Sequence, residues 1–264
     1  MASSSTERSA RTPSRPQPRG AGAETLEWVK SLAVALALFL VIRTFLLQAF
    51  SIPSGSMEST LLVGDYLMAN NTVFGPRLPF TETRLPGIRD PRPGEVVVFR
   101  PTYNRPVIDV VKRVIGVPGD TLRMEGGVVY RNGKRLEEPY ATPAEGPDEP
   151  IALVGSTDAF LSEGVDPARY GHHNHLPLLP PSVDRESYRP TANRWGPLVV
   201  PPGHYFLMGD NRAASLDSRF MGPIPREVIT GKPMFIYFSY DPTVERAFTF
   251  ITAARWGRIG TVIR

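Results

Sequence analysis

The sequence predicts a mainly β, antiparallel domain that follows one N-terminal transmembrane helix. Past residue 50, short runs of Val, Ile, Phe and Tyr recur, and each is closed by Pro or Gly. Such runs are typical of β-strands separated by turns; they read EVVVFRP, VIDVVKRVIGVPGD, GVVYRNGKRL, GPLVVPPGHYFLMGD and GKPMFIYFSYDP. Asn132-Gly133 is the strongest hairpin turn among them. The helix is predicted by one uninterrupted apolar run, residues 31–50.

The composition limits the kinds of protein that remain. The chain has 264 residues, of which 41% are hydrophobic, enough to build a core. With 28 Pro and 23 Gly, a mainly helical fold is disfavoured. No cysteine is present, which excludes disulfides, thiolate nucleophiles, zinc–cysteine sites and iron–sulfur clusters. The net charge of +4 is not gathered into a basic face, so we expect no nucleic-acid partner.

The apolar run SLAVALALFLVIRTFLLQAF, residues 31–50, has the length of a membrane span, because twenty helical residues cover about 30 Å. Its only formal charge, Arg43, is near the C-terminal end, where the side chain can reach the interface. A buried core helix is one alternative, and a cleaved secretory signal is another. A signal has a shorter apolar core of about 7 to 15 residues, so we expect an uncleaved signal-anchor.

Residues 1–30 are rich in Ser, Pro, Gly and Ala without apolar periodicity, which indicates a disordered basic tail. Arginines precede the span and little charge follows it, so the positive-inside rule places the N-terminus in the cytoplasm. Residues 51–264 are then the exported domain.

Two segments of this domain give weak signals. Residues 137–193 shift to Pro and acidic residues, and we interpret them as an insertion of unknown role. The spacing of its histidines is poor for a metal site, so we expect a solvated loop and no metal; they are His172, His173 and His175. Residues 248–264 mix aromatic, aliphatic and arginine side chains, and a membrane-interface segment and an ordinary terminal element are equally compatible with them.

Ser56 is the candidate nucleophile. It follows the apolar run by six residues, in PSGSM, and six extended residues reach at most about 20 Å, so we expect it close to the outer membrane surface. Pro53 prevents the helix from continuing, and Gly55 permits a tight loop that presents the serine. The motif alone is weak, because Ser-Gly pairs also fill ordinary turns.

Lys112 is the candidate base. It is the only one of the four lysines inside an apolar strand, where alternation places it on the face of Val110 and Val114. An ammonium among aliphatic side chains tends to lose its proton, and a neutral lysine can accept the proton of a serine. We therefore predict activity that rises with pH. The alternative is a strand lysine whose amine simply extends to water.

A third polar segment, GDNRAASLDSRFMG, follows the apolar strand HYFLM. Asp217 and Arg219 are two residues apart and so can pair from the same side of an extended chain, which would fix the loop. Ser215 can hydrogen-bond a buried amine and hold it in place.

In this order, the span, PSGSM, VVKRVIGVPGD, the GVVYRNGK hairpin and GDNR-x-x-S-x-D-SR resemble bacterial type I signal peptidase, the membrane-anchored Ser/Lys leader peptidase. The resemblance implies a signal-peptidase/LexA-like antiparallel sheet and no cofactor or metal. It implies Ser56 as nucleophile, Lys112 as general base, and the Ser54 side chain with the Ser56 backbone N–H as oxyanion hole. It also implies that Ser215 orients the lysine and that Asp217 and Arg219 form a structural ion pair. The sequence departs from the family at residues 213–214, Ala-Ala, where Asp followed by Asn or Ser is frequent.

The function implied is removal of N-terminal signal peptides from exported preproteins with small residues at −3 and −1, through an acyl-enzyme. The resemblance places such an enzyme in the bacterial inner membrane as a single-pass protein with its catalytic domain on the periplasmic side; its partners are the lipid bilayer and, as a further candidate, the secretion translocon. The main alternative is a single-span exported binding or scaffold protein without catalysis. A β-lactamase-like enzyme is disfavoured, because its motif has a lysine three residues after the serine and no lysine here is so placed.

Overall fold

The computed structural model describes residues 21–76, 81, 83–100, 108–143, 148, 150–151, 175, 178–244 and 249–264. The chain divides into two units, Met1–Val41 and Ile42–Arg264. The first contains helix α1 (Ala21–Val41). Large apolar side chains are exposed along α1, among them Trp28, Leu32 and Val34. In the part of the chain that the structure describes, no helix is both long enough and apolar enough to cross a membrane.

The boundaries of this helix differ from those predicted. It begins ten residues earlier, inside the segment expected to be a disordered tail, whose residues 1–20 lie outside the described ones. It ends at Val41 and is followed by a π-helix, η1 (Ile42–Leu46). Leu47–Phe50, placed in the span by the sequence, instead belong to strand β1 (Leu47–Ser51). The physical reason is pairing, since β1 runs antiparallel to β2 (Asp65–Asn70) over its whole length and buries Phe50.

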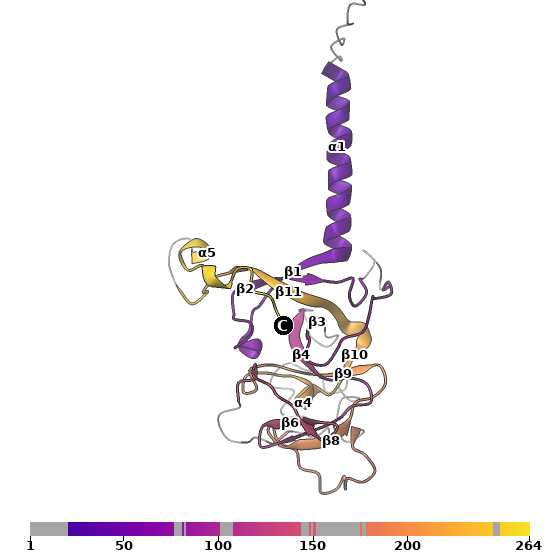
Figure 1. Ribbon diagram of the computed structural model, residues 1–264, viewed down its shortest axis with the longest axis vertical. Coiled ribbons are helices and arrows are strands. Elements are labelled where there is room, and N and C mark those ends of the chain that lie inside the picture. The colour runs from indigo at the N-terminus through magenta and orange to yellow at the C-terminus, as the bar shows by residue number, and fades with distance from the viewer. Residues whose placement is uncertain are drawn as a thin grey trace, which may run out of the picture. The chain divides into compact units, whose positions relative to one another are not determined.

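The second unit is built on two antiparallel sheets, as expected for a mainly β chain (Figure 1). Seven strands form the larger sheet in the order β1-β2-β11-β3-β4-β9-β10. Beyond β1 and β2, its strands are β3 (Val96–Phe99), β4 (Val110–Gly116), β9 (His204–Met208), β10 (Ile224–Pro225) and β11 (Ile229–Ser239). Short helical turns η2 (Gly55–Met57), α4 (Ser218–Met221) and η4 (Arg226–Val228) connect them.

The smaller sheet has the order β7-β6-β5-β8. Its strands are β5 (Thr121–Glu125), β6 (Val128–Arg131), β7 (Lys134–Arg135) and β8 (Trp195–Val199). The predicted Asn132-Gly133 turn joins β6 to β7, with both residues at positive φ as such a two-residue turn requires. The chain ends in α5 (Thr249–Thr252) and η5 (Trp256–Arg258), where Phe250, Ile251 and Trp256 are exposed.

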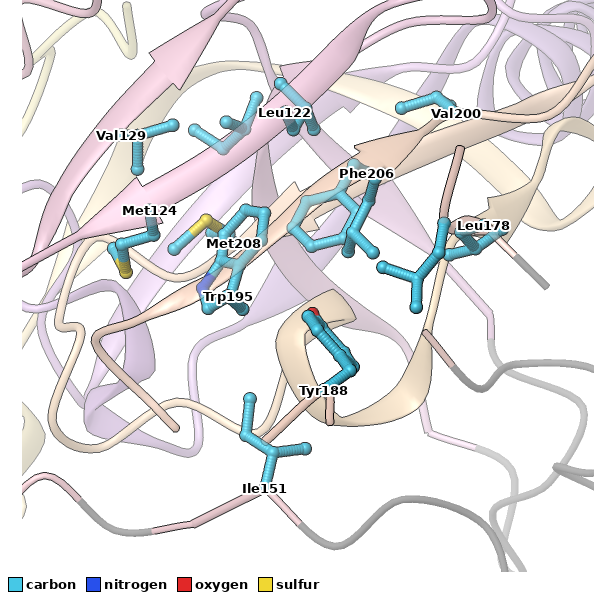
Figure 2. Close-up of a cluster of buried hydrophobic side chains, with 13 residues drawn as sticks. Leu122, Met124, Val129, Ile151, Leu178, Tyr188, Trp195, Val200, Phe206 and Met208 are labelled. Atoms are coloured by element: carbon cyan, nitrogen blue, oxygen red, sulfur yellow. The ribbon is translucent and has the colours of Figure 1, made fainter. Parts of the chain in front are cut away.

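A cluster of buried side chains joins the two sheets (Figure 2). Phe206 and Met208 of β9 come from the larger sheet, and Leu122, Met124 and Trp195 from the smaller. Trp195 stacks on Phe206 with ring centroids 5.0 Å apart. Ile151 and Tyr188, from the insertion, pack into the same cluster. The smaller sheet and the described parts of the insertion are therefore fixed to the sheet that carries β4.

Candidate active site

Ser56 is the central residue of η2, the 3-10 turn that follows β1. The segment before it is held against β2, because the Ile52 N–H donates to the Asp65 carbonyl at 2.9 Å and the Gly64 N–H donates to the Ile52 carbonyl at 3.0 Å. The turn then closes with the Glu58 N–H donating to Gly55. Ser56 is buried, so its hydroxyl is held by protein rather than by bulk water.

Lys112 lies in β4, opposite Val97 of β3, in the middle of the larger sheet. Its side chain is only 2% exposed, and Nζ donates to Ser56 Oγ at 2.5 Å. The structure thus brings the two principal predicted residues into direct contact, although they are 56 positions apart in the chain.

The surroundings of Lys112 lower the pKa of its amine to about 8, from an ordinary value of 10.5. Burial is the largest cause, because removal of water penalises the charged form. The negative charges of Asp217 and Asp210 raise the pKa, and the positive charge of Arg219 lowers it. A substantial fraction of the amine is therefore unprotonated near neutral pH, which a general base requires.

Asp217 and Arg219 form the predicted ion pair and are completely buried. Arg219 donates to both carboxylate oxygens, from Nε and Nη2, at 2.9 Å each. Asp217 also caps α4 by accepting the Arg219 N–H, and it accepts the Gly209 N–H at 3.1 Å. Burial alone would raise the pKa of Asp217, but the Arg219 guanidinium, with Lys112 and the Gly209 N–H, holds it below its usual value. The carboxylate stays charged beside Lys112.

Ser215 is placed differently from the expectation. Its hydroxyl donates to Asp217 Oδ2 at 2.7 Å, and among the described residues no hydrogen bond joins it to Lys112. A serine hydroxyl has one proton to donate, and here the carboxylate takes it. Ser215 is therefore connected to Lys112 through Asp217, whose charge raises the pKa of the amine.

Gly209 brings the two loops of the site together. A Cβ atom at this position would lie 2.3 Å from Ser215 Oγ and 2.4 Å from the Ser56 carbonyl oxygen. No real side chain tolerates such distances, so only glycine allows the loop after β9 to reach the turn of the nucleophile. The Asn211 N–H completes the junction by donating to the Ser56 carbonyl at 3.1 Å.

Two hydrogen-bond donors in the turn of the nucleophile have no acceptor among the described residues. Ser54 is exposed, and its side chain makes no capping bond to η2. The Ser56 N–H belongs to the first turn of η2, where backbone N–H groups have no acceptor within the helix. The oxyanion hole implied by the resemblance, the Ser54 hydroxyl with the Ser56 N–H, stays a prediction.

The sequence analysis missed a second buried ion pair, Arg113 with Asp210. Arg113 Nε and Nη2 donate to the two carboxylate oxygens at 2.8 and 2.7 Å. The guanidinium also lies 3.8 Å over the ring of Tyr140. Asp109, which alternation places on the face of Arg113, pairs with Arg100 instead. The signal in the sequence was the Asp of GDNR, but its partner is 97 residues away.

Arg212, from the same GDNR motif, connects the insertion to the site. Its guanidinium donates to both oxygens of Glu138, at 3.2 and 2.6 Å, and to the Gly209 carbonyl at 3.1 Å. Both side chains of this pair are buried. The start of the insertion therefore supports the loop after β9, which carries Gly209 and Arg212.

The histidines do not form a metal site in the described part of the chain. His172 and His173 lie outside the described residues. His175 is 2% exposed, which corrects the expectation of a solvated loop. It packs beside Tyr188 and Trp195, and burial lowers its pKa to about 4. Within the described residues, no group of three His, Cys, Asp or Glu side chains is arranged to hold a metal ion.

A small cavity lies next to the nucleophile. Its volume is about 100 Å³, and its walls come from the end of β1 and the turn after it on one side and from the start of β4 on the other. Ile52, Met57 and Val110 give it apolar walls, and Ser54 and Ser56 lie on its border.

Comparison with known proteins shows the family of the chain. Residues 25–238 match the family model described as "Signal peptidase, peptidase S26". The chain is 36% identical to "Signal peptidase I" of Pseudomonas aeruginosa, over 85% of this chain and 77% of that protein. It is 34% identical to "Signal peptidase I" of Pseudomonas fluorescens, over 81% and 73%.

Among solved structures, a crystal structure of a signal peptidase I from Enterococcus faecalis V583 is 24% identical and covers 55% of this chain and 98% of that one, with a TM-score of 0.32. The family model and the curated relatives confirm the resemblance inferred from the motifs. With a match over more than four-fifths of its length and the Ser56–Lys112 contact in place, the chain belongs to the signal peptidase family, peptidase S26.

Proposed function

We propose that the chain is a membrane-anchored serine endopeptidase that removes N-terminal signal peptides from exported preproteins. The observation that carries this proposal is the 2.5 Å contact between Ser56 Oγ and the buried Lys112 Nζ in a chain of this family. The alternative of a scaffold protein without catalysis has no support from the relatives, which are named as peptidases.

The mechanism follows from the positions of the side chains. Neutral Lys112 accepts the proton of Ser56 while Oγ attacks the carbonyl carbon before the scissile bond. The Ser54 hydroxyl and the Ser56 N–H donate to the oxyanion, a contribution of about 3 kcal/mol for each donor. The Lys112 ammonium then protonates the leaving amine, and the signal peptide remains as an ester on Ser56. Water, deprotonated by the same amine, hydrolyses the ester and regenerates the serine.

The cavity beside Ser56 supports a preference for small side chains at −1. A volume of about 100 Å³ with apolar walls accommodates a methyl group and excludes a large or charged side chain. We propose the same preference at −3, because in an extended substrate the side chains of residues −1 and −3 point to the same side.

Attachment to the membrane is the second part of the proposal. Eight large apolar side chains of α1 are at least half exposed, a surface that water does not favour: Trp28, Val29, Leu32, Val34, Leu36, Leu38, Phe39 and Leu40. Arginines before the helix support an N-terminus in the cytoplasm and a catalytic unit on the outer side of the inner membrane. Carbonate extraction tests the attachment. Protease added outside spheroplasts tests the side on which the catalytic unit lies.

Cleavage of a preprotein in detergent tests the enzymatic proposal. We expect Ser56→Ala and Lys112→Ala each to lower kcat/KM by at least about 10³-fold, as for other residues that act as a unit in catalysis. The matched controls are Ser187→Ala, at an exposed serine, and Lys232→Ala, at a lysine paired with Glu95, and both should retain activity. Full activity in either active-site variant would exclude the proposed roles.

A further inference from the structure

The carboxylate of Glu58 lies at the border of the active site without a catalytic assignment. Glu58 directly follows η2, and its side chain folds back over Gly55. A Cβ atom on Gly55 would be 3.0 to 3.1 Å from the Glu58 carboxylate atoms. Asn211 Nδ2 donates to Glu58 Oε2 at 3.2 Å, and the Asn211 backbone N–H donates to the Ser56 carbonyl. The carboxylate therefore occupies the space beside Gly55 and is hydrogen-bonded by Asn211, whose backbone also binds the residue of the nucleophile.

The backbone around Glu58 is fixed as well. Ser59 has φ of +92°, a backbone conformation that residues other than glycine adopt only where the surrounding structure imposes it. Its hydroxyl donates to the Tyr140 carbonyl, and the next residue, Thr60, donates to Asp210 at 2.5 Å. Glu58 therefore projects from a rigid segment, even though its own side chain is exposed.

The position of Glu58 relative to the cavity indicates which part of a substrate it meets. The walls of the cavity proposed for residue −1 come from residues 51–57 and 108–111 and include neither Glu58 nor Asn211. In a substrate with residue −1 in that cavity and its carbonyl at Ser56, the residues after the scissile bond lie outside these walls. Glu58 and Asn211 border Ser56 outside the same walls, so their surface is available to the first residues of the mature chain.

Within the described residues, the charge of Glu58 has no cationic partner, since no Lys or Arg forms an ion pair with it. Two arginines of the network that supports the site already have carboxylate partners, Arg113 with Asp210 and Arg212 with Glu138. A negative charge therefore faces the departing segment of the substrate.

We propose that Glu58 is a specificity-determining residue that favours a basic side chain, and disfavours an acidic one, at +1 or +2 of the mature chain. This inference rests on the proposed function and extends it to the mature chain, which is the first product released. Charges about 4 Å apart in a largely aqueous setting give effects of several-fold, and salt screens them.

The test uses three preproteins that are identical through −1 and carry Lys, Gln or Glu at +1, with a second set that varies +2. We expect wild-type kcat/KM to be about 3- to 10-fold higher for Lys than for Glu at the more sensitive position. Glu58→Gln preserves an oxygen that accepts from Asn211, and it should bring this ratio close to one. Glu58→Lys should invert it. Glu227→Gln, at an exposed glutamate on η4, is the matched control and should keep the wild-type ratio.

The ratio is independent of any general loss of activity in a variant, so each variant gives a decisive value. An unchanged ratio in Glu58→Gln, or a wild-type ratio that stays the same in 1 M salt, would overturn the role of Glu58 and leave the proposed function intact. Failure of the wild-type protein to cleave any of the preproteins would overturn the proposed function and this inference with it.

Discussion

Lys112 and His175 are two buried basic side chains in two regions of one unit, and the chain uses them in opposite ways. Each is 2% exposed, and burial is the main cause that lowers the pKa of each. Lys112, in the larger sheet, contacts a hydroxyl and feels the charges of Asp217, Arg219 and Asp210. His175, in the insertion, lies between the rings of Tyr188 and Trp195.

The two residues differ in which groups oppose the effect of burial on the pKa. Around Lys112, carboxylates oppose the desolvation and hold the pKa at about 8, close enough to neutral pH for proton transfer. Around His175, burial is the largest cause of the low pKa of about 4; no carboxylate of the described residues opposes it, and only a backbone hydrogen bond with Arg219 raises the pKa. The Tyr188 hydroxyl accepts the Gly196 N–H and lies 3.0 Å from His175 Nδ1. Burial with nearby carboxylates thus leaves Lys112 able to exchange a proton near neutral pH, whereas burial without them keeps His175 neutral there.

The largest expected effect comes from removing the compensating carboxylate. Asp217→Asn leaves the buried Arg219 guanidinium without its charge partner, and we expect a loss of about 3 to 5 kcal/mol in the free energy of unfolding. Tyr188→Phe removes only a neutral hydroxyl beside His175 and should cost about 1 to 3 kcal/mol. Urea denaturation of both variants measures the two values. Equal losses would remove the distinction between the two regions.

The second effect concerns stability in acid. The folded pKa of His175, about 4, is below its ordinary value of 6.5, so between these pH values the unfolded chain binds a proton that the folded chain does not. Stability from this residue is present above pH 6.5 and is lost as pH falls towards 4, by up to about 3 kcal/mol. His175→Phe should therefore flatten the decline in unfolding free energy between pH 7 and pH 4. His204→Phe, at a less buried histidine, is the control, and an equal flattening there would contradict this account.

The third effect is the pH dependence of cleavage. Only neutral Lys112 accepts a proton, so kcat/KM should rise about tenfold per pH unit below pH 8 and level off above it. The His175→Phe variant should show the same profile, because the histidine titrates well below this range. A profile that is flat from pH 6 to pH 9, with chemistry shown to be rate-limiting, would exclude Lys112 as the base.

The smallest effect tests the indirect position of Ser215. Ser215→Ala removes one hydrogen bond to Asp217 and should lower kcat/KM by about tenfold, the equivalent of a single bond. If Ser215 acts through the carboxylate, the acid limb of the pH profile should shift as well. Ser215→Thr retains a hydroxyl and should restore part of the activity. A large loss with no shift of the profile would indicate that Ser215 acts elsewhere.

The sequence predicted the parts of the site that depend on local pattern. Strand alternation placed Lys112 among apolar neighbours, and the spacing of Asp217 and Arg219 predicted their pairing. The antiparallel fold class followed from short apolar runs closed by turn residues. These inferences hold because each needs only a few neighbouring residues and the geometry of an extended chain.

The remaining features depend on pairing between distant segments, which no local pattern specifies. Leu47–Phe50 are apolar enough for a helix, but β2 is available to pair with them. Arg113 forms an ion pair with Asp210, and Arg212 forms one with Glu138. The sequence predicted a solvated His175 because no local pattern indicates its aromatic neighbours. Tyr188 comes from a segment without regular periodicity, and Trp195 belongs to strand β8.

The contact at Gly209 restricts how this enzyme can change over time. Because the nucleophile's carbonyl and the Ser215 hydroxyl meet at a position with no room for even a methyl group, neither loop can be lengthened, shifted or exchanged independently of the other. The exposed side chain of Glu58, in contrast, lies outside this close contact, so a different residue there leaves the Gly209 junction in place.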